Sequence, residues 1–290
     1  MGVSEIKNRI PSWASAWNGG FSPSSGFSLL LLGDTMTKIR IDKKQLLDYL
    51  SSFGKATEDL HIKFSVTEGV GWMQSTVAFI SHYLKKKRQV KGEVVDAGTV
   101  DITELVKARQ FLKAGKADTV TVIQLGSAKT LQLICGSSKV TMPTNSTTIS
   151  HSKAVLFNKL IDAAVLSKWT KFHDADLSVS GIISLDGLST VSKMRGILNS
   201  SPVFKVTAHA SEGEFLVSSG KRYETKLFTT LELKDATGPV EGSVASTFGV
   251  WLMDSIALLG TGEATIHIGE GTVLVIEKDD DLLVIVDQRE

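Results

Sequence analysis

Apolar residues follow a helical spacing and then an alternating spacing in two separate stretches of the chain, residues 100–144 and 246–287. The helical positions are Ile102, Leu105, Val106 and Leu112 in the first stretch, and Phe248, Trp251, Leu252 and Leu258 in the second. The alternating runs are 119–125, 130–135 and 139–142, and then 264–268, 272–277 and 282–286. The same order of elements, found twice, predicts a duplicated unit.

Each of these stretches is preceded by a second pattern that also occurs twice. Alternation, a helix and renewed alternation are predicted over 37–41, 43–53 and 60–64, and again over 177–183, 185–198 and 203–208. Further strands are predicted over 70–80 and 89–95 in the first unit and over 214–217 and 226–233 in the second. We therefore expect an α+β protein of two tandem, pseudo-symmetric domains, each with eight or nine strands and two helices.

The patterns divide the chain into four parts: a leader at 1–35, domain 1 at 36–146, a connector at 147–175 and domain 2 at 176–290. The leader is rich in Ser, Gly, Pro and Trp without periodicity, which indicates disorder, and whether it belongs to the mature protein stays open. A secretory signal is disfavoured because a polar stretch separates Lys7 and Arg9 from the apolar residues 27–32. The connector has helical periodicity over 154–169, and we expect it to pack against a sheet.

Composition narrows the classes of protein without naming one. The chain has 290 residues, 42% hydrophobic and 22% charged, with a formal net charge of +1. Any nucleic-acid binding must therefore depend on where the charges lie. The single cysteine, Cys135, cannot form an internal disulfide, which fits an intracellular, reducing compartment such as the cytoplasm or nucleoid. No apolar run approaches the roughly 18 residues of a membrane span.

Three segments and the order of the elements resemble the DNA sliding clamps, in particular the two-domain type of proliferating cell nuclear antigen and the phage clamps. The segments are "EGVGWMQST" after "HIKFSV", "VDITELVKARQFLKAGKADTVTVIQL", and the C-terminal "FGVWLMDSIALLGTGEATIHIGEGTVLVIEKDDDLLVIVDQRE". The resemblance covers residues 36–290. It implies a processivity factor without enzymatic activity or cofactor: a homo-oligomeric ring, expected to be a trimer, with its sheets outside and its helices around a hole. Such a ring encircles double-stranded DNA without reading its sequence, tethers a DNA polymerase and depends on a separate clamp loader ATPase.

In a clamp the inward-facing helices must tolerate the phosphate backbone, so basic residues on or just beyond the first three helices are the candidates for facing DNA. They are Lys43, Lys44, Lys107, Arg109, Lys113, Lys116, Lys193 and Arg195. For any one of them, an ordinary solvated helix face is an equally good interpretation. The fourth predicted helix has only Asp254 as a charged residue.

The resemblance also implies a pocket for a partner peptide between the domains, beneath the connector and near the C-terminus. The candidates are Ile149, Val155, Leu156, Ile285, Val286, Asp287 and Gln288. Core packing is the alternative for all except Asp287 and Gln288. The residues after the last predicted strand lack the proline-containing docking motif of the family, which puts docking through the tail in doubt.

The segment "HYLKKKRQVK" concentrates Lys85, Lys86, Lys87, Arg88 and Lys91. So dense a charge predicts an exposed loop or strand end. Three interpretations are open for this segment. It contacts DNA at the rim of the ring, or it forms a solvated hairpin, or, as a weaker third interpretation, it serves as a nuclear-targeting patch.

No set of residues indicates an enzyme. The six histidines are scattered and form no metal pair, and "GTGEATIHIGEG" follows a predicted helix, the wrong context for a phosphate loop. Asp279, Asp280 and Asp281 are expected at a hairpin tip in preference to a cation site. Two rivals to the clamp remain: a viral structural protein of a shell or tail ring, and a monomeric polymerase accessory subunit that binds DNA on one face.

Overall fold

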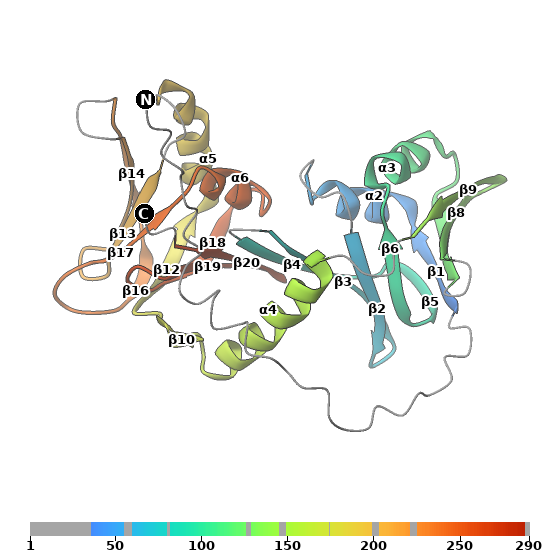
Figure 1. Cartoon of the computed structure of the whole chain (residues 1–290), viewed down its shortest axis with the longest axis horizontal. Helices are drawn as coiled ribbons and strands as arrows, with labels where there is room; N and C mark the ends of the chain where they lie inside the picture. The colour runs from blue at the N-terminus through green and yellow to red at the C-terminus, as the bar shows by residue number, and fades with distance from the viewer. Residues whose placement is uncertain are drawn as a thin grey trace, which may run out of the picture.

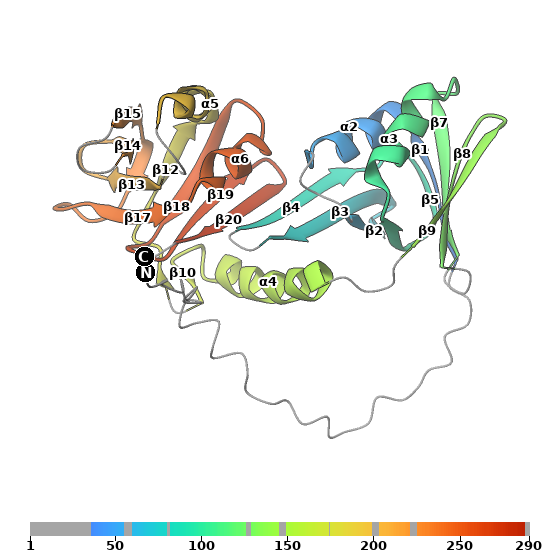
Figure 2. The ribbon, with the colours of Figure 1, turned by 45° about the horizontal axis from the view of Figure 1, so that its top comes forward.

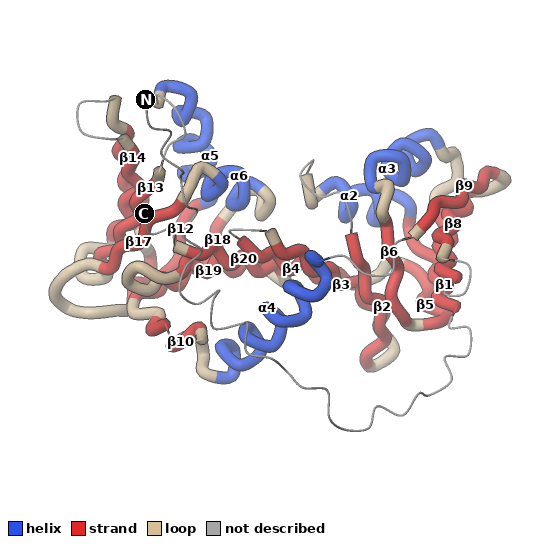
Figure 3. Tube along the Cα trace, viewed as in Figure 1, coloured by secondary structure: helices blue, strands red, loops and turns tan. Residues whose placement is uncertain are grey.

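The structure is a computed structural model that describes residues 36–54, 60–79, 82–125, 129–144, 149–173, 175–198, 203–220 and 225–287. The predicted leader therefore lies outside the described residues. Strands make up most of both halves of the molecule (Figures 1 and 3).

The first repeat contains nine described strands and two helices. In chain order they are β1 (Met36–Asp42), α2 (Lys43–Ser51), β2 (Leu60–Thr67), β3 (Val70–Ala78), β4 (His82–Gln89), β5 (Gly92–Asp96), β6 (Gly98–Ile102), α3 (Leu105–Ala114), β7 (Thr119–Leu125), β8 (Thr130–Cys135) and β9 (Ser138–Pro143).

The second repeat has the same order of elements. It consists of β12 (Val179–Ser184), α5 (Leu185–Met194) with the short 3-10 turn Arg195–Ile197, β13 (Phe204–His209), β14 (Glu214–Ser219), β15 (Leu227–Glu232), β16 (Lys234–Thr237), β17 (Val244–Phe248), α6 (Trp251–Ala257), β18 (Glu263–Ile268), β19 (Val273–Lys278) and β20 (Asp281–Val286). Between the repeats lie α4 (Ile149–Leu166) and the short strands β10 (Lys171–Phe172) and β11 (Ala175–Asp176).

The strand pairings confirm that the two repeats are equivalent. The order β5-β1-β7-β8-β9 in the first repeat corresponds to β16-β12-β18-β19-β20 in the second, and β4-β3-β2-β6 corresponds to β15-β14-β13-β17. Inside the chain, β20 pairs antiparallel with β4, so that two of these sheets merge into one nine-stranded sheet across the domain boundary. The two domains are thus joined by a backbone ladder.

All four helices of the repeats lie on one side of the sheets, and α4 lies on the opposite side (Figure 2). The inward faces of the helices and sheets share one large apolar core, which includes Leu46 of α2, Leu112 of α3, Leu188 of α5 and Leu252 of α6. This arrangement confirms the predicted α+β architecture of two pseudo-symmetric domains with the helices in a single layer. None of the described helices is both long and apolar enough to cross a lipid bilayer.

Two helices begin later than the apolar pattern predicts. Ile102 ends strand β6, where it pairs with Leu60, and Phe248 ends β17, where it pairs with Phe204. The prediction was wrong at these positions because a strand that runs directly into a helix places its last inward residue at a spacing that also fits the helix. The helices themselves begin at Leu105 and Trp251.

The basic run forms strand β4, and the predicted exposed loop is wrong. β4 lies between β3 and β20 in the middle of the nine-stranded sheet. Lys86 is only 2% exposed and points into the domain junction, whereas Lys85 and Lys87 point to the other face, as alternation in a strand requires. The run was misread because the residues that accommodate its charge lie far away in the sequence.

Helix α4 packs against a sheet, as predicted for the connector, and it does so across the domain junction. Phe157 stacks on Tyr83 of β4 with 5.1 Å between ring centroids, and the Tyr83 hydroxyl donates a hydrogen bond of 2.7 Å to Asn158 Oδ1. Ile161 and Ala164 of α4 join Val275 and Val284 in a second apolar core on this face of the sheet. Side chains from both domains are thus held under one helix.

Candidate functional site

Exposed lysines extend along the helix layer, mainly in domain 1. Lys44 on α2, Lys107 and Lys113 on α3 and Lys193 on α5 are exposed, and Lys116 is exposed just beyond α3. Lys107 also forms an ion pair with Glu104 at 2.5 Å. The structure thus presents five of the eight predicted DNA-facing residues to solvent on or next to the helices.

Two of the other three hold the helices of domain 1 together. Lys43 Nζ donates to the carbonyl oxygen of Gly115 at 2.6 Å. The Arg109 guanidinium donates to the carbonyl oxygens of Leu50 and Gly54, which lie at the end of α2. Burial lowers the pKa of Arg109. The guanidinium nevertheless stays protonated, and therefore positively charged, throughout the ordinary pH range.

The helix layer of domain 2 is less basic than that of domain 1. Arg195 lies in the 3-10 turn after α5, and its side chain is outside the described structure. Asp186 and Asp254 are exposed on α5 and α6, and Trp251 is 55% exposed. Sequence reasoning placed Trp251 on the apolar side of its helix and so missed this exposed aromatic residue.

A buried ion network joins the domains where β4 meets β20. Arg88 donates to both carboxylate oxygens of Asp281, at 2.5 and 2.8 Å, and Lys86 Nζ lies 3.5 Å from Asp281 Oδ2. Lys86 also donates to the carbonyl oxygen of Leu258, just after α6, at 2.6 Å. Burial lowers the pKa of Lys86, whereas the hydrogen bond to Asp281 raises the pKa of Arg88. Asp281 thus compensates two cations from the other domain.

Some residues of the predicted partner pocket are buried, and others are accessible to solvent. Ile285 is 2% exposed, Val286 packs against the second apolar core, and Val155 of α4 is 44% exposed beside the half-buried Leu156. Asp287 is buried, and its carboxylate accepts a hydrogen bond of 2.9 Å from the Thr247 backbone N–H. The side chain of Ile149 and the whole of Gln288 lie outside the described structure. Asp287 thus serves at least partly to fix the end of β20.

His82 lies next to this region, because it pairs with Ile285 at the start of β4. Its ring stacks on Phe79, with 4.1 Å between centroids, and the residue is 8% exposed. Burial lowers the pKa of His82 from 6.5 to about 4. The imidazole is therefore neutral in the folded protein at pH 7.

This lowered pKa predicts a loss of stability in mild acid. Below pH 6.5 the unfolded chain protonates His82 before the folded chain does, so stability declines as pH falls from about 6.5 to about 4. His82→Phe is expected to remove up to about 3 kcal/mol of this pH-dependent loss. Urea unfolding of both proteins at several pH values between 7 and 4 checks this, and equal pH dependence in the two would contradict it.

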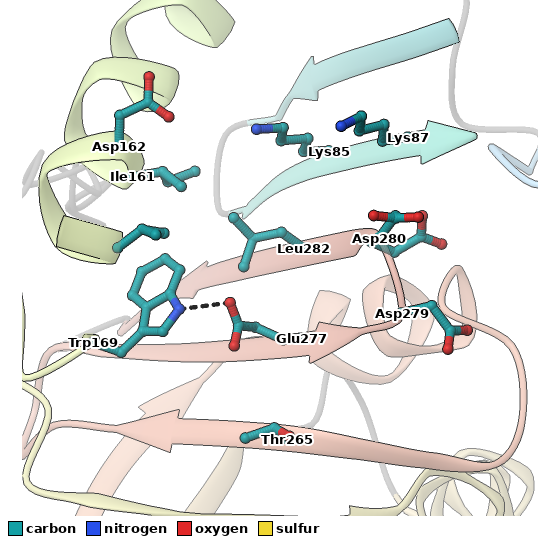
Figure 4. A pocket seen from close by; sticks show the side chains of 12 residues that line it. Lys85, Lys87, Ile161, Asp162, Trp169, Thr265, Glu277, Asp279, Asp280 and Leu282 are labelled. Atoms are coloured by element: carbon teal, nitrogen blue, oxygen red, sulfur yellow. Dashed lines mark hydrogen bonds between the residues drawn. The ribbon is translucent and has the colours of Figure 1, made fainter. Parts of the chain in front are cut away.

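A cavity of about 680 Å³ lies beside the C-terminal half of α4 (Figure 4). Its lining comes from α4 and the residues after it, from β4, from β18 and from the β19–β20 hairpin: Lys85, Lys87, Ile161, Asp162, Val165, Trp169, Thr265, Glu277, Asp279, Asp280, Asp281 and Leu282. None of the predicted partner-pocket residues whose side chains the structure describes is among them. Sequence reasoning missed this cavity because its walls meet only in the folded chain.

Two residues of the aspartate run form a hairpin tip, as predicted, whereas Asp281 is the first residue of β20 and is buried. Asp279 and Asp280 make the turn between β19 and β20, and Asp279 has a positive φ of 53°. Within the described part of the chain, no group of three or more His, Cys, Asp or Glu residues could hold a metal ion.

Two strands that correspond to the paired β4 and β20 end their sheets. β15, the counterpart of β4, is the last strand of the four-stranded sheet, and β9, the counterpart of β20, is the last strand of the five-stranded sheet. Phe228 on β15 is 63% exposed. Edge strands present unpaired backbone N–H and C=O groups, so both are suited to pair with another chain.

Comparison with solved structures finds the same architecture in bacterial clamps, whereas no protein-family model and no curated protein matches the sequence. A Helicobacter pylori β clamp in complex with 5-chloroisatin is similar with a TM-score of 0.61 at 14% identity, covering 87% of this chain and 63% of that one. A DNA polymerase sliding clamp from Caulobacter crescentus gives 0.64 at 12% identity, with 94% and 69% covered. An H. pylori β clamp bound to a DNA ligase peptide gives 0.61 at 12%, with 87% and 67% covered.

The chain thus spans about two thirds of the length of these clamps. At such low identity the likeness concerns the fold alone, and the finer likeness to proliferating cell nuclear antigen and the phage clamps stays a prediction. The strand order, the single helix layer and these neighbours agree, and the chain has the sliding-clamp fold.

Proposed function

We propose that the protein is a processivity factor: a ring of identical chains that encircles duplex DNA and tethers a DNA polymerase. The observation that carries this proposal is the pairing of β4 with β20 inside the chain while their counterparts β15 and β9 remain at sheet edges. Pairing β15 of one copy with β9 of the next would repeat the internal junction. Such a head-to-tail contact forms a closed ring when the rotations that relate successive copies add up to a full turn.

The proposed ring contains three copies, so that six similar domains surround the hole. The helix layer would face the DNA, and the exposed lysines on it would attract phosphates without fixing the ring at one sequence. The helices are not covered by other described elements, which disfavours a shell protein with a buried helix layer (Figure 2). The chain makes or breaks no bond in this proposal, and loading onto DNA falls to a separate ATPase.

The proposal also assigns a role to each part of the chain. Domain 1 at 36–146 and domain 2 at 176–290 would be the two repeating units, with the connector at 147–175 as a strap over their junction. Partner peptides would bind beside α4 at the end of β20, near Val155, Leu156 and Val286. One clamp neighbour of the same fold is described as bound to a DNA ligase peptide.

Size-exclusion chromatography with light scattering tests the ring directly. We expect a discrete species of about three times the 31.3 kDa of the chain. The trimer should also lengthen polymerase products on primed circular DNA in the presence of a loader. A monomer at all concentrations would contradict the ring and favour the monomeric accessory subunit.

Removing charge from the helix layer tests the DNA-facing surface. Replacing Lys44, Lys107, Lys113 and Lys193 with glutamine is expected to lower affinity for a short fluorescent duplex by about tenfold at low salt, because fewer counterions are released. Anisotropy titrations at several salt concentrations should also give a shallower salt dependence. Lys63→Gln with Lys205→Gln is the control, because these exposed lysines alternate with core residues and so face away from the helices. An equal loss in the control would contradict the assigned DNA face.

A further inference from the structure

The cavity beside α4 is separate from the partner region at the C-terminal end of β20. It lies at the opposite end of that strand, against Asp281, Leu282 and the hairpin tip. A six-residue strand spans about 17 Å between its first and last residues, at about 3.4 Å per residue. The two regions therefore lie at opposite ends of β20 and share none of the residues that line the cavity.

The apolar part of the cavity is preformed. Ile161, Trp169 and Leu282 are each less than 10% exposed, and Val165 adds a half-exposed apolar side chain. The Trp169 indole N–H donates to Glu277 Oε1 at 2.5 Å (Figure 4). The Trp169 ring also stacks on the His267 ring, with 5.8 Å between centroids. A fixed apolar surface of this kind can receive an apolar side chain without first being ordered.

The charge around this surface is unevenly compensated. Asp281 is neutralised by Lys86 and Arg88, and Lys87 lies over the Trp72 ring at 4.3 Å from its centroid. Asp162, Asp279 and Asp280 form no ion pair among the described residues, and all three are exposed. The cavity thus combines an apolar floor with an excess of negative charge at the rim, countered on the wall formed by β4 by Lys85 and Lys87.

We propose that this cavity binds a segment of a partner protein in which an aliphatic side chain stands next to one or two lysines or arginines. The aliphatic group enters between Trp169 and Leu282, and the cations face Asp162 and the tip at Asp279 and Asp280. The excess of negative charge at the rim repels phosphate, which disfavours nucleic acid as the occupant. The volume of about 680 Å³ suits several side chains. The identification of the partner as a replication protein rests on the proposed function. The binding chemistry assigned to the cavity is independent of that function.

The test uses two fluorescein-labelled synthetic peptides that share a central Leu-Leu and carry either two flanking lysines or two flanking glutamates. We expect the full chain to bind the lysine peptide at least about tenfold more tightly in anisotropy titrations. Asp279→Asn with Asp280→Asn is expected to weaken the lysine peptide by about tenfold, with a smaller salt dependence. Asparagine tolerates the positive φ of residue 279, so the hairpin is retained.

Val165→Lys should also abolish binding, whereas Ala163→Lys, at another exposed position of the same helix outside the cavity, should not. Equal affinity for both peptides, or equal loss in the Ala163 control, would overturn the proposal. Tighter binding to a chain that lacks residues 1–35, which include Lys7 and Arg9, would assign the cavity to the leader instead. Failure of ring assembly with peptide binding intact would overturn only the proposed function.

Discussion

Asp281→Ala is expected to lower the free energy of unfolding by about 3–5 kcal/mol, the usual cost of removing one partner from a buried ion pair. Asp281 is 4% exposed and faces two cations of the other domain. Without it, Lys86 would stay buried with the Leu258 carbonyl oxygen as its one acceptor among the described residues. Arg88 would lose both its hydrogen bonds to the carboxylate. Urea unfolding at pH 7, followed by circular dichroism, measures the loss.

Asp280→Ala is the matched control for this change. Asp280 is the neighbouring residue, but it is exposed and in no ion pair among the described residues, so its removal should shift stability by less than about 0.5 kcal/mol. The double variant Lys86→Met, Asp281→Leu should recover part of the loss, because it also removes a buried cation. A similar loss in the two single variants would show that the network does not hold the junction.

Phe228→Glu is expected to dissociate the proposed trimer into monomers at micromolar concentration. Phe228 is the exposed aromatic residue of the free edge strand β15, the counterpart of β4. An aromatic residue at the centre of an interface contributes about 2 kcal/mol or more, and a carboxylate in its place would be desolvated without a partner. We therefore expect the dissociation constant to rise by at least about 30-fold. Light scattering over a dilution series measures it.

Val95→Glu is the control for the edge variant. Val95 is 52% exposed and lies on β5, which also ends its sheet but has no role in the proposed contact. This variant should remain a trimer and unfold at the same urea concentration as the parent protein, whereas Phe228→Glu should keep the circular dichroism spectrum of a folded chain as a monomer. Dissociation of both, or of neither, would mean that β15 does not form the contact between copies.

The sequence was sufficient for the architecture because helical and alternating apolar spacings differ and each appears twice. The pairing of β4 with β20 could not be predicted from the sequence, because Arg88 and Asp281 are 193 positions apart and no local pattern connects them. For the same reason a run of lysines was predicted to be solvated, although one of them is buried. The acceptor of a buried cation can come from anywhere in the chain.

The candidate sites were predictable only in part. A helical pattern identifies which lysines lie on a helix, but Lys43 and Arg109 reach carbonyl oxygens of neighbouring segments that the pattern does not locate. Asp287 looked like a free tail residue, yet its carboxylate accepts a hydrogen bond from β17. The cavity beside α4 depends on how a connector crosses a sheet, and periodicity specifies only that it has an apolar face.

The continuous ladder at β4 and β20 has a consequence for how DNA would enter the proposed ring. Backbone pairing, a buried ion network and the strap of α4 all reinforce the junction inside each chain. A seam between two copies would have its own backbone pairing, but no helix covalently tied to both sides. A gate wide enough for a duplex would therefore open between copies, while each chain moves as a single rigid arc.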